Sequence, residues 1–247
     1  MNKITKVDIL AIGVHPDDVE LSCSGTLLRH IAQGKTVGLL DLSQGELGTR
    51  GTAEIRLKEA EDSARLMGAS FRVNLGMRDG FFRPTEENIR KTIEVIRAAQ
   101  PTIVLANAPK DRHPDHGRAS HLAYEACFYA GLQKIETKDT EGQAQERWRP
   151  SALYYYVQDY NLEADFVVDI TDHIDKREEL ILAFRSQFHL PDAEEYKEEL
   201  QTPISGEDFL DYLRARARTV GRPCGFDYGE SFIAARIPGV KDLFSLL

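Results

Sequence analysis

Two short polar clusters contain the residue types that a catalytic metal site needs. Residues 15–18 read His-Pro-Asp-Asp, and residues 111–116 read Asp-Arg-His-Pro-Asp-His. A catalytic zinc site usually takes three nitrogen or oxygen ligands from the protein and keeps a position for a water molecule, whose pKa falls to about 7. Two histidines and one carboxylate would meet that requirement. The sequence therefore predicts a Zn²⁺ site that activates water for hydrolysis.

The spacing of residues within the first cluster assigns different roles to its two aspartates, one as a metal ligand and the other as a general base. With His15 on the metal, the carboxylate of Asp18 can curl back onto the same ion, whereas Asp17 points elsewhere and is free to act as the base. Pro16 restricts the backbone between them, which helps to hold ligand and base at a fixed separation. In the second cluster, His116 completes the coordination.

His113 is expected to face the substrate, and two roles for it stay open. Its imidazolium could stabilise the tetrahedral oxyanion, or it could protonate the departing amine. In either role, Asp115 is expected to orient its ring from behind.

Each residue also has a simpler explanation. Asp17 or Asp18 could cap a helix that begins near residue 19, and Asp115 could cap the helix after the second cluster. A single loop histidine is usually solvated or hydrogen-bonded. Capping does not require histidine, however, and both clusters follow expected strands at the same edge of the sheet. Together they favour the metal site.

The elements that position these clusters alternate between apolar strands and amphipathic helices, which predicts an α/β fold. Parallel strands joined by helices form a mostly parallel central sheet with helices on both faces, and ligands bind beyond the carboxyl ends of its strands. The expected strands are residues 7–14, 36–42, 71–75, 102–107, 152–157, 166–169 and 232–237. The expected helices are residues 19–33, 52–67, 86–99, 117–131, 171–188 and 206–220.

Length and composition narrow the class of protein. The 247 residues are expected to form a single domain, 1–247, and the net charge of −9 argues against nucleic-acid binding. The three cysteines show no paired spacing, which fits a reducing compartment. We see neither a signal peptide nor an apolar run long enough to span a membrane, so we expect a cytoplasmic protein that does not bind membranes.

The two clusters, placed after an early strand and a later one, resemble the paired motifs of the LmbE-like, or PIG-L, family of zinc N-deacetylases. The resemblance continues in residues 45–51, 54–56, 74–75 and 186–188. Within the family it is strongest to the bacillithiol-pathway deacetylases, which remove acetate from an N-acetylglucosamine unit joined to malate. The carboxy-terminal third matches more loosely.

This resemblance implies a Rossmann-like fold, a homo-oligomer and a small-molecule amino-sugar conjugate as substrate. It implies His15, Asp18 and His116 as zinc ligands and Asp17 as the base. It also assigns Arg56, and Arg50 beside it, to substrate binding, where a guanidinium group suits a carboxylate or sugar hydroxyls.

Three alternatives remain. The substrate could be another N-acyl sugar conjugate. The pattern of His113, Asp115 and His116 also resembles part of a metallo-β-lactamase motif, but position 111 is Asp where that motif has histidine, and residues 15–18 would stay unexplained. A noncatalytic protein that binds metal or sugar is the third, although it has no need for the unligated Asp17.

Overall fold

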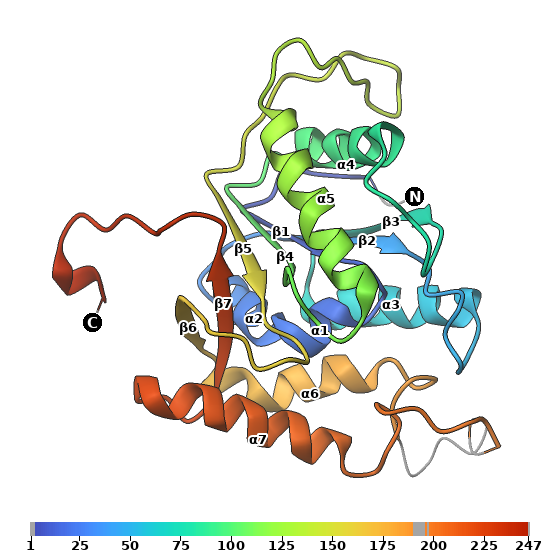
Figure 1. Ribbon diagram of the computed structural model, residues 1–247, viewed down its shortest axis with the longest axis vertical. Coiled ribbons are helices and arrows are strands. Elements are labelled where there is room, and N and C mark those ends of the chain that lie inside the picture. Colours follow the sequence, from blue (N-terminus) through green and yellow to red (C-terminus); the bar gives the residue numbers. More distant parts are fainter. Residues whose placement is uncertain (1–2, 190–195, 197, 247) are drawn as a thin grey trace.

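The computed structural model describes residues 3–189, 196 and 198–246, and a seven-stranded sheet forms its centre (Figure 1). The strands are β1 (Ile9–Gly13), β2 (Val37–Ser43), β3 (Phe71–Met77), β4 (Ile103–Asn107), β5 (Ala152–Tyr156), β6 (Phe166–Asp169) and β7 (Gly229–Ala234). Their order is β3-β2-β1-β4-β5-β7-β6. The first five pair in parallel, whereas β7 runs antiparallel to both β5 and β6. The mostly parallel sheet predicted from the sequence is confirmed.

Helices cover both faces of the sheet, also as predicted. They are α1 (Asp18–Ser22), α2 (Ser24–Ala32), α3 (Ala53–Met67), α4 (Glu86–Ala99), α5 (Pro114–Ala130), α6 (Ile174–Leu182) and α7 (Phe209–Gly221). Alternation along β1 shows the two layers: Leu10 and Ile12 pack with α4 and α5, while Ile9 and Ala11 pack with α1, α2, α3 and α6. Both sides of β1 are buried, as a parallel strand between two helical layers requires.

Some boundaries differ from the sequence prediction for tertiary reasons. The expected helix 19–33 is interrupted at Cys23, which has φ −145° and separates α1 from α2. The expected helix 171–188 ends at Leu182, because the chain beyond it turns inward: the backbone N–H and the hydroxyl of Ser186 donate to the carboxylate of Glu59, both at 2.7 Å. The last strand ends at Ala234 rather than at residue 237.

A buried ionic network ties α1 to the sheet. Arg72 on β3 donates to both carboxylate oxygens of Asp41 on β2, at 2.7 and 2.8 Å, and to Glu20 of α1 at 2.6 Å. All three side chains are at most 3% exposed. Burial raises the pKa of Asp41, although the guanidinium of Arg72 opposes that rise. Since α1 begins at Asp18, this network helps to fix the start of the helix next to the first polar cluster.

Among the helices that the structure describes, none combines the length and the apolar character that a membrane span needs.

We predict that Arg72→Leu destabilises the protein by about 3–5 kcal/mol, because it leaves two buried carboxylates without their cation. Lys91→Leu is the control, since Lys91 forms an exposed pair with Glu87 on α4; it should cost less than about 0.5 kcal/mol. Urea unfolding of both variants measures the difference. Similar midpoints for the two variants would show that the network does not contribute to stability.

Candidate active site

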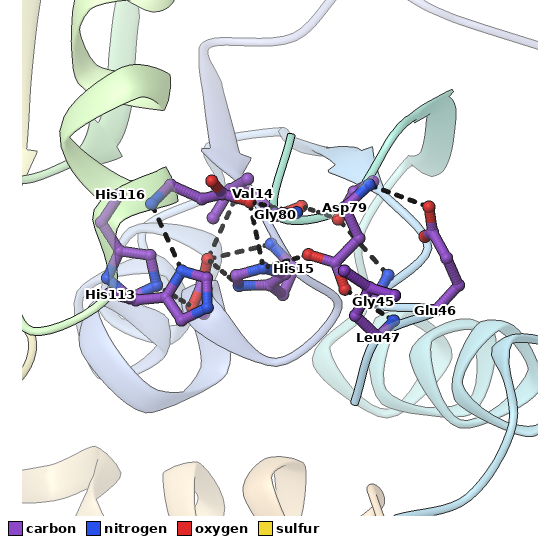
Figure 2. Close-up of polar contacts among 12 residues, drawn as sticks. Val14, His15, Gly45, Glu46, Leu47, Asp79, Gly80, His113 and His116 are labelled. Carbon is purple, nitrogen blue, oxygen red and sulfur yellow. Dashed lines mark hydrogen bonds and ion pairs between the residues drawn. The ribbon is translucent and has the colours of Figure 1, made fainter. Parts of the chain in front are cut away.

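The two polar clusters meet at the carboxyl ends of β1 and β4, which are neighbours in the sheet. His15, Asp17, Asp18, His113 and His116 all line one pocket. Ring nitrogens of the three histidines lie within 4.8 Å of one another. Figure 2 shows His15 with His113 and His116 on one side and the carboxylate of Asp79 on the other. The structure therefore brings the predicted ligands and base together.

Asp18 is the most heavily bonded carboxylate of the site. Its Oδ2 accepts hydrogen bonds at 3.0 Å from the backbone N–H groups of Val14 and His15 and from the amide of Asn107. Its Oδ1 accepts one from the side chain of Gln158, also at 3.0 Å. The residue is 2% exposed. These donors hold the carboxylate in one orientation.

Two imidazoles flank the same carboxylate. His116 Nε2 lies 3.3 Å from Oδ1 of Asp18, and His15 Nδ1 lies 3.7 Å from Oδ2. Burial alone would raise the pKa of Asp18, but the charges of His116 and His15 hold it well below its usual range. Asp18 in turn raises the pKa of His116 to about 10, against the effect of burial.

Each of these imidazoles contacts a second carboxylate through its other nitrogen. His15 Nε2 lies 3.0 Å from Asp79, and His116 Nδ1 lies 2.7 Å from Asp111. Burial alone would raise the pKa of Asp79, but the hydrogen bond with His15 and the charge of His15 lower it to about 2. Outer carboxylates of this kind orient metal-bound histidines. We did not predict either role: Asp111 opens the second cluster, whereas Asp79 follows β3 and has no histidine beside it in the sequence.

His15, Asp18 and His116 supply the nitrogen and carboxylate donors that a zinc ion takes in proteins. Zinc takes nitrogen and carboxylate ligands at about 2.0–2.2 Å, so neighbouring donors on a tetrahedral ion lie about 3.3 Å apart. His116 Nε2 lies 3.3 Å from Oδ1 of Asp18 and His15 Nδ1 lies 3.7 Å from Oδ2, so each carboxylate oxygen is near that distance from one imidazole. His113 is also within reach of the two imidazoles, but Asp18 supplies the negative charge and already faces both rings.

Asp17 occupies an unusual backbone conformation. Its φ of 123° is rare for a residue with a side chain and costs about 1–3 kcal/mol. Although it precedes α1, its side chain makes no capping hydrogen bond there. Instead, Oδ2 accepts a bond from Arg56 at 3.1 Å. Burial raises the pKa of Asp17 to about 7, although the charge of Arg56 opposes that rise.

Arg56 lines the pocket, yet its guanidinium is bonded to the protein. Besides Asp17, it donates to the carbonyl oxygens of Pro16 at 2.7 Å and Gly45 at 3.2 Å. Gly45 has φ +66°, and a Cβ there would lie 2.1 Å from Arg56 Nη1, so the close approach needs glycine. Arg56 thus holds the turn that carries Asp17.

Arg50 lies away from the pocket. Its Nε donates to the carbonyl of Ser186 at 2.9 Å, its Nη2 to that of Tyr196 at 3.3 Å, and Glu199 lies 3.8 Å away. It is 5% exposed and is not among the residues that line the cavity. The structure therefore does not place the expected second substrate-binding arginine in the site. The guanidinium of Arg50 is bonded instead to the turn at residues 183–188, through the carbonyl of Ser186.

His113 is oriented by the backbone rather than by a carboxylate. Its Nδ1 accepts a hydrogen bond from the N–H of Asp115 at 3.3 Å. The carboxylate of Asp115, which we expected behind the ring, accepts from Gly80 N–H at 2.7 Å and from Arg118. Burial, followed by the charges of His15 and His116, lowers the pKa of His113.

The pocket has a volume of about 230 Å³, somewhat below the range of about 300–1,000 Å³ that is usual for small-molecule sites. Segments distant in sequence complete its walls. Leu47 lines it from the loop after β2, and Phe209 and Tyr212 line it from the first turns of α7. Arg112 also lines it, with its side chain 53% exposed and paired with Asp159.

The chain is similar to known proteins. A family model described as "PIG-L: GlcNAc-PI de-N-acetylase" matches residues 10–127. The structure of the conserved protein TT1542 from Thermus thermophilus is similar, with 36% identity, coverage of 95% of this chain and 98% of that one, and a TM-score of 0.81.

Two curated relatives have different activities. The diacetylchitobiose deacetylase of Thermococcus kodakarensis is 29% identical over 97% of this chain and 85% of its own length. The 4-oxalmesaconate hydratase of Pseudomonas putida is 26% identical over 73% of this chain and 74% of its own length. The family match includes both polar clusters, and the likeness to TT1542 extends over nearly the whole chain. The chain belongs to the PIG-L family of LmbE-like deacetylases.

Proposed function

We propose that this protein is a zinc-dependent N-deacetylase that removes acetyl from an N-acetylglucosamine conjugate. The observation that carries this proposal is the position of Asp17. A buried carboxylate with a pKa of about 7 lies directly beside the proposed donors His15, Asp18 and His116, and all four residues line the same pocket. Deacetylation is favoured over hydration because the deacetylase relative covers 97% of the chain, against 73% for the hydratase.

In this proposal His15, Asp18 and His116 hold the metal, and Asp79 and Asp111 keep the two imidazoles in place. When bound, zinc polarises an amide carbonyl and acidifies water, which is the chemistry that hydrolysis of an N-acetyl group requires. Metal binding needs unprotonated imidazoles, so protons and metal compete for His116.

Asp17 takes the proton of the attacking water and returns it to the amine nitrogen as the carbon–nitrogen bond breaks, so that acetate and the free amine leave. A general base works best when its pKa is near the working pH, and about 7 meets that condition. Arg56 acts through Asp17: its hydrogen bond fixes the carboxylate, and its charge limits the rise of the pKa. The strained φ of Asp17 is what a positioned base would require, whereas a protein that only binds metal or sugar gains nothing from it.

His113 stabilises the oxyanion that forms on the amide oxygen. Because its Nδ1 accepts the N–H of Asp115, the proton of the neutral ring is on Nε2. The lowered pKa keeps the ring neutral, so it donates a hydrogen bond rather than a proton. This assignment chooses between the two roles left open by the sequence.

For the substrate we propose an acidic conjugate, N-acetylglucosaminyl malate. Arg112 supports this choice, since it lines the pocket and more than half of its side chain is exposed. A guanidinium group can bind a carboxylate with two parallel hydrogen bonds. The aromatic side chains of Phe209 and Tyr212 offer a surface on which a sugar ring can pack. This surface suits charged and uncharged sugar conjugates equally.

The experiment that tests the proposal is acetate release from N-acetylglucosaminyl malate, N-acetylglucosamine and diacetylchitobiose. We expect release from the first at the highest kcat/KM, loss on adding a chelator, and recovery on adding zinc. Zinc-loaded protein that releases acetate from none of the three would overturn the proposed activity. A preference for diacetylchitobiose would keep the activity and change the substrate.

The first prediction for this site concerns the metal. His15→Ala, Asp18→Ala and His116→Ala should each lose zinc, because each removes about one third of the protein donors. His113→Ala is the control and should keep zinc while losing activity. Metal analysis after dialysis measures this, and full zinc content in any one of the first three variants would remove that residue from the donor set.

The second prediction separates the adjacent aspartates. Asp17→Asn should retain zinc and lose at least about 10²-fold in kcat, because an amide cannot accept the proton. Asparagine suits this test because it tolerates positive φ. Asp18→Asn should instead lose zinc affinity, since a neutral amide oxygen is a poorer donor. If added zinc rescued Asp17→Asn but not Asp18→Asn, the two roles would be reversed.

The third prediction concerns the acidic group of the substrate. Arg112→Ala should cost about 1.5–3 kcal/mol more in kcat/KM for N-acetylglucosaminyl malate than for N-acetylglucosamine, since only the former loses a charged partner. Arg50→Ala is the control: because Arg50 lies outside the pocket, any loss should be equal for the two substrates. Equal losses in Arg112→Ala would exclude it as the carboxylate contact.

A further inference from the structure

The outer carboxylate beside His15 also holds a segment that lines the pocket. Asp79 Oδ1 lies 3.0 Å from His15 Nε2, while its Oδ2 accepts the backbone N–H of Leu47 at 2.9 Å. The N–H of Asp79 in turn donates to Glu46 Oε1 at 2.8 Å. Figure 2 shows Asp79 between His15 and the loop that carries Glu46 and Leu47. Asp79 thus joins an imidazole of the site to residues 44–48, which follow β2 and which we call the β2 wall.

Asp111 makes the equivalent link from His116. Its Oδ2 lies 2.7 Å from His116 Nδ1, and its Oδ1 accepts the backbone N–H groups of Asp159 at 3.3 Å and Tyr160 at 3.1 Å. These N–H groups belong to residues 157–160, which follow β5 and which we call the β5 wall. Arg216 of α7 donates to the carbonyl oxygens of the same two residues, at 2.7 and 3.0 Å. The β5 wall is therefore held between Asp111 and α7.

Both walls present residues to the substrate. Leu47 lines the pocket from the β2 wall, and Asp159 lines it from the β5 wall. Arg112, the proposed contact for a substrate carboxylate, is paired with Asp159. Leu47 is 61% exposed and Tyr160 43%. Exposed segments without regular secondary structure open locally at a low cost in free energy, so their order depends on the hydrogen bonds that the two outer carboxylates accept.

A carboxylate transmits an orientation from one oxygen to the other because the group is rigid and planar. In the proposed donor set, the imidazole nitrogens that face Asp18 bind the metal, and these are Nδ1 of His15 and Nε2 of His116. The other nitrogen of each ring then carries the proton and donates it to Asp79 or Asp111. Hydrogen bonds to an ionised carboxylate are roughly twice as strong as neutral ones. Occupation of the metal site therefore fixes both carboxylates.

We propose that metal binding orders the two walls of the pocket, and that Asp79 and Asp111 are the positioning residues that link each metal-binding imidazole to its wall. The proposal rests on the metal donors of the proposed function but is independent of the substrate. A wall that is already ordered spares the substrate the entropy of ordering it. The metal therefore binds first and improves the substrate site as well as supplying the chemistry.

The first test measures amide hydrogen exchange of the full chain by NMR, before and after loading with Zn²⁺. We expect the N–H groups of Leu47 and Tyr160 to exchange at least about fivefold more slowly with zinc, which is the lower end of typical coupling between two sites. The N–H of Ser70 is the control, since it donates to the carbonyl of Val37 at 2.7 Å at the amino ends of β2 and β3, across the sheet from the site. Equal slowing at Ser70 would indicate general stabilisation and overturn the proposal.

The second test uses two isosteric variants, each of which is the control for the other. In Asp79→Asn the amide oxygen can still accept the N–H of Leu47, but the NH2 group cannot accept the ring proton of His15. The zinc response of Leu47 should therefore disappear while that of Tyr160 remains, and Asp111→Asn should give the reverse. Excess zinc, checked by metal analysis of each sample, compensates for the weaker binding expected after loss of an outer carboxylate.

The outcomes separate this proposal from the proposed function. Zinc uptake without slower exchange at either wall would overturn the proposal and leave the function intact, whereas a protein that takes up no zinc would overturn both. A folded variant that keeps the full zinc response at both walls, or loses it at both, would exclude the assigned links. The measurement on the unaltered chain decides the proposal even where a variant does not fold.

Discussion

A buried carboxylate must be surrounded by hydrogen-bond donors or by positive charge. The carboxylate of Asp18 meets this requirement through donors from several strands, and the arrangement of the sheet around the site depends on them. Its partners come from the ends of three strands: Val14 and His15 follow β1, Asn107 ends β4, and Gln158 follows β5. The carboxyl ends of these strands must therefore be level with one another. The parallel register of β1, β4 and β5 provides that alignment.

Adjacent aspartates acquire opposite properties from this arrangement. Asp18 faces backbone donors and two imidazoles, which stabilise its charge. Asp17, turned aside by its positive φ, is buried with Arg56 as its cation, and its charge is less well compensated. The same burial therefore leaves Asp18 ionised, with a pKa well below its usual range, and raises the pKa of Asp17 to about 7. The difference depends on the backbone turn rather than on the residue type.

Sequence patterns predicted most of the fold because apolar alternation and helix boundaries are local properties. They also identified the two polar clusters, since their histidines are unusual after buried strands. The sequence missed what depends on distant contacts. Nothing near Asp79 indicates that it lies on His15, and the interior position of Arg50 depends on a turn more than a hundred residues later.

The pairing of β1 with β4 has a consequence for how the protein matures. The chain between them contributes β2, β3 and the helices around them, and the hydrogen bond from Val14 to Asn107 spans 93 residues. His15 and His116 cannot approach each other until this part of the sheet has formed, since non-local contacts of this length form late in folding. A nascent chain would thus hold separate, weak donors until α5 emerges from the ribosome. The two histidines therefore come together only once the amino-terminal half has reached its native order.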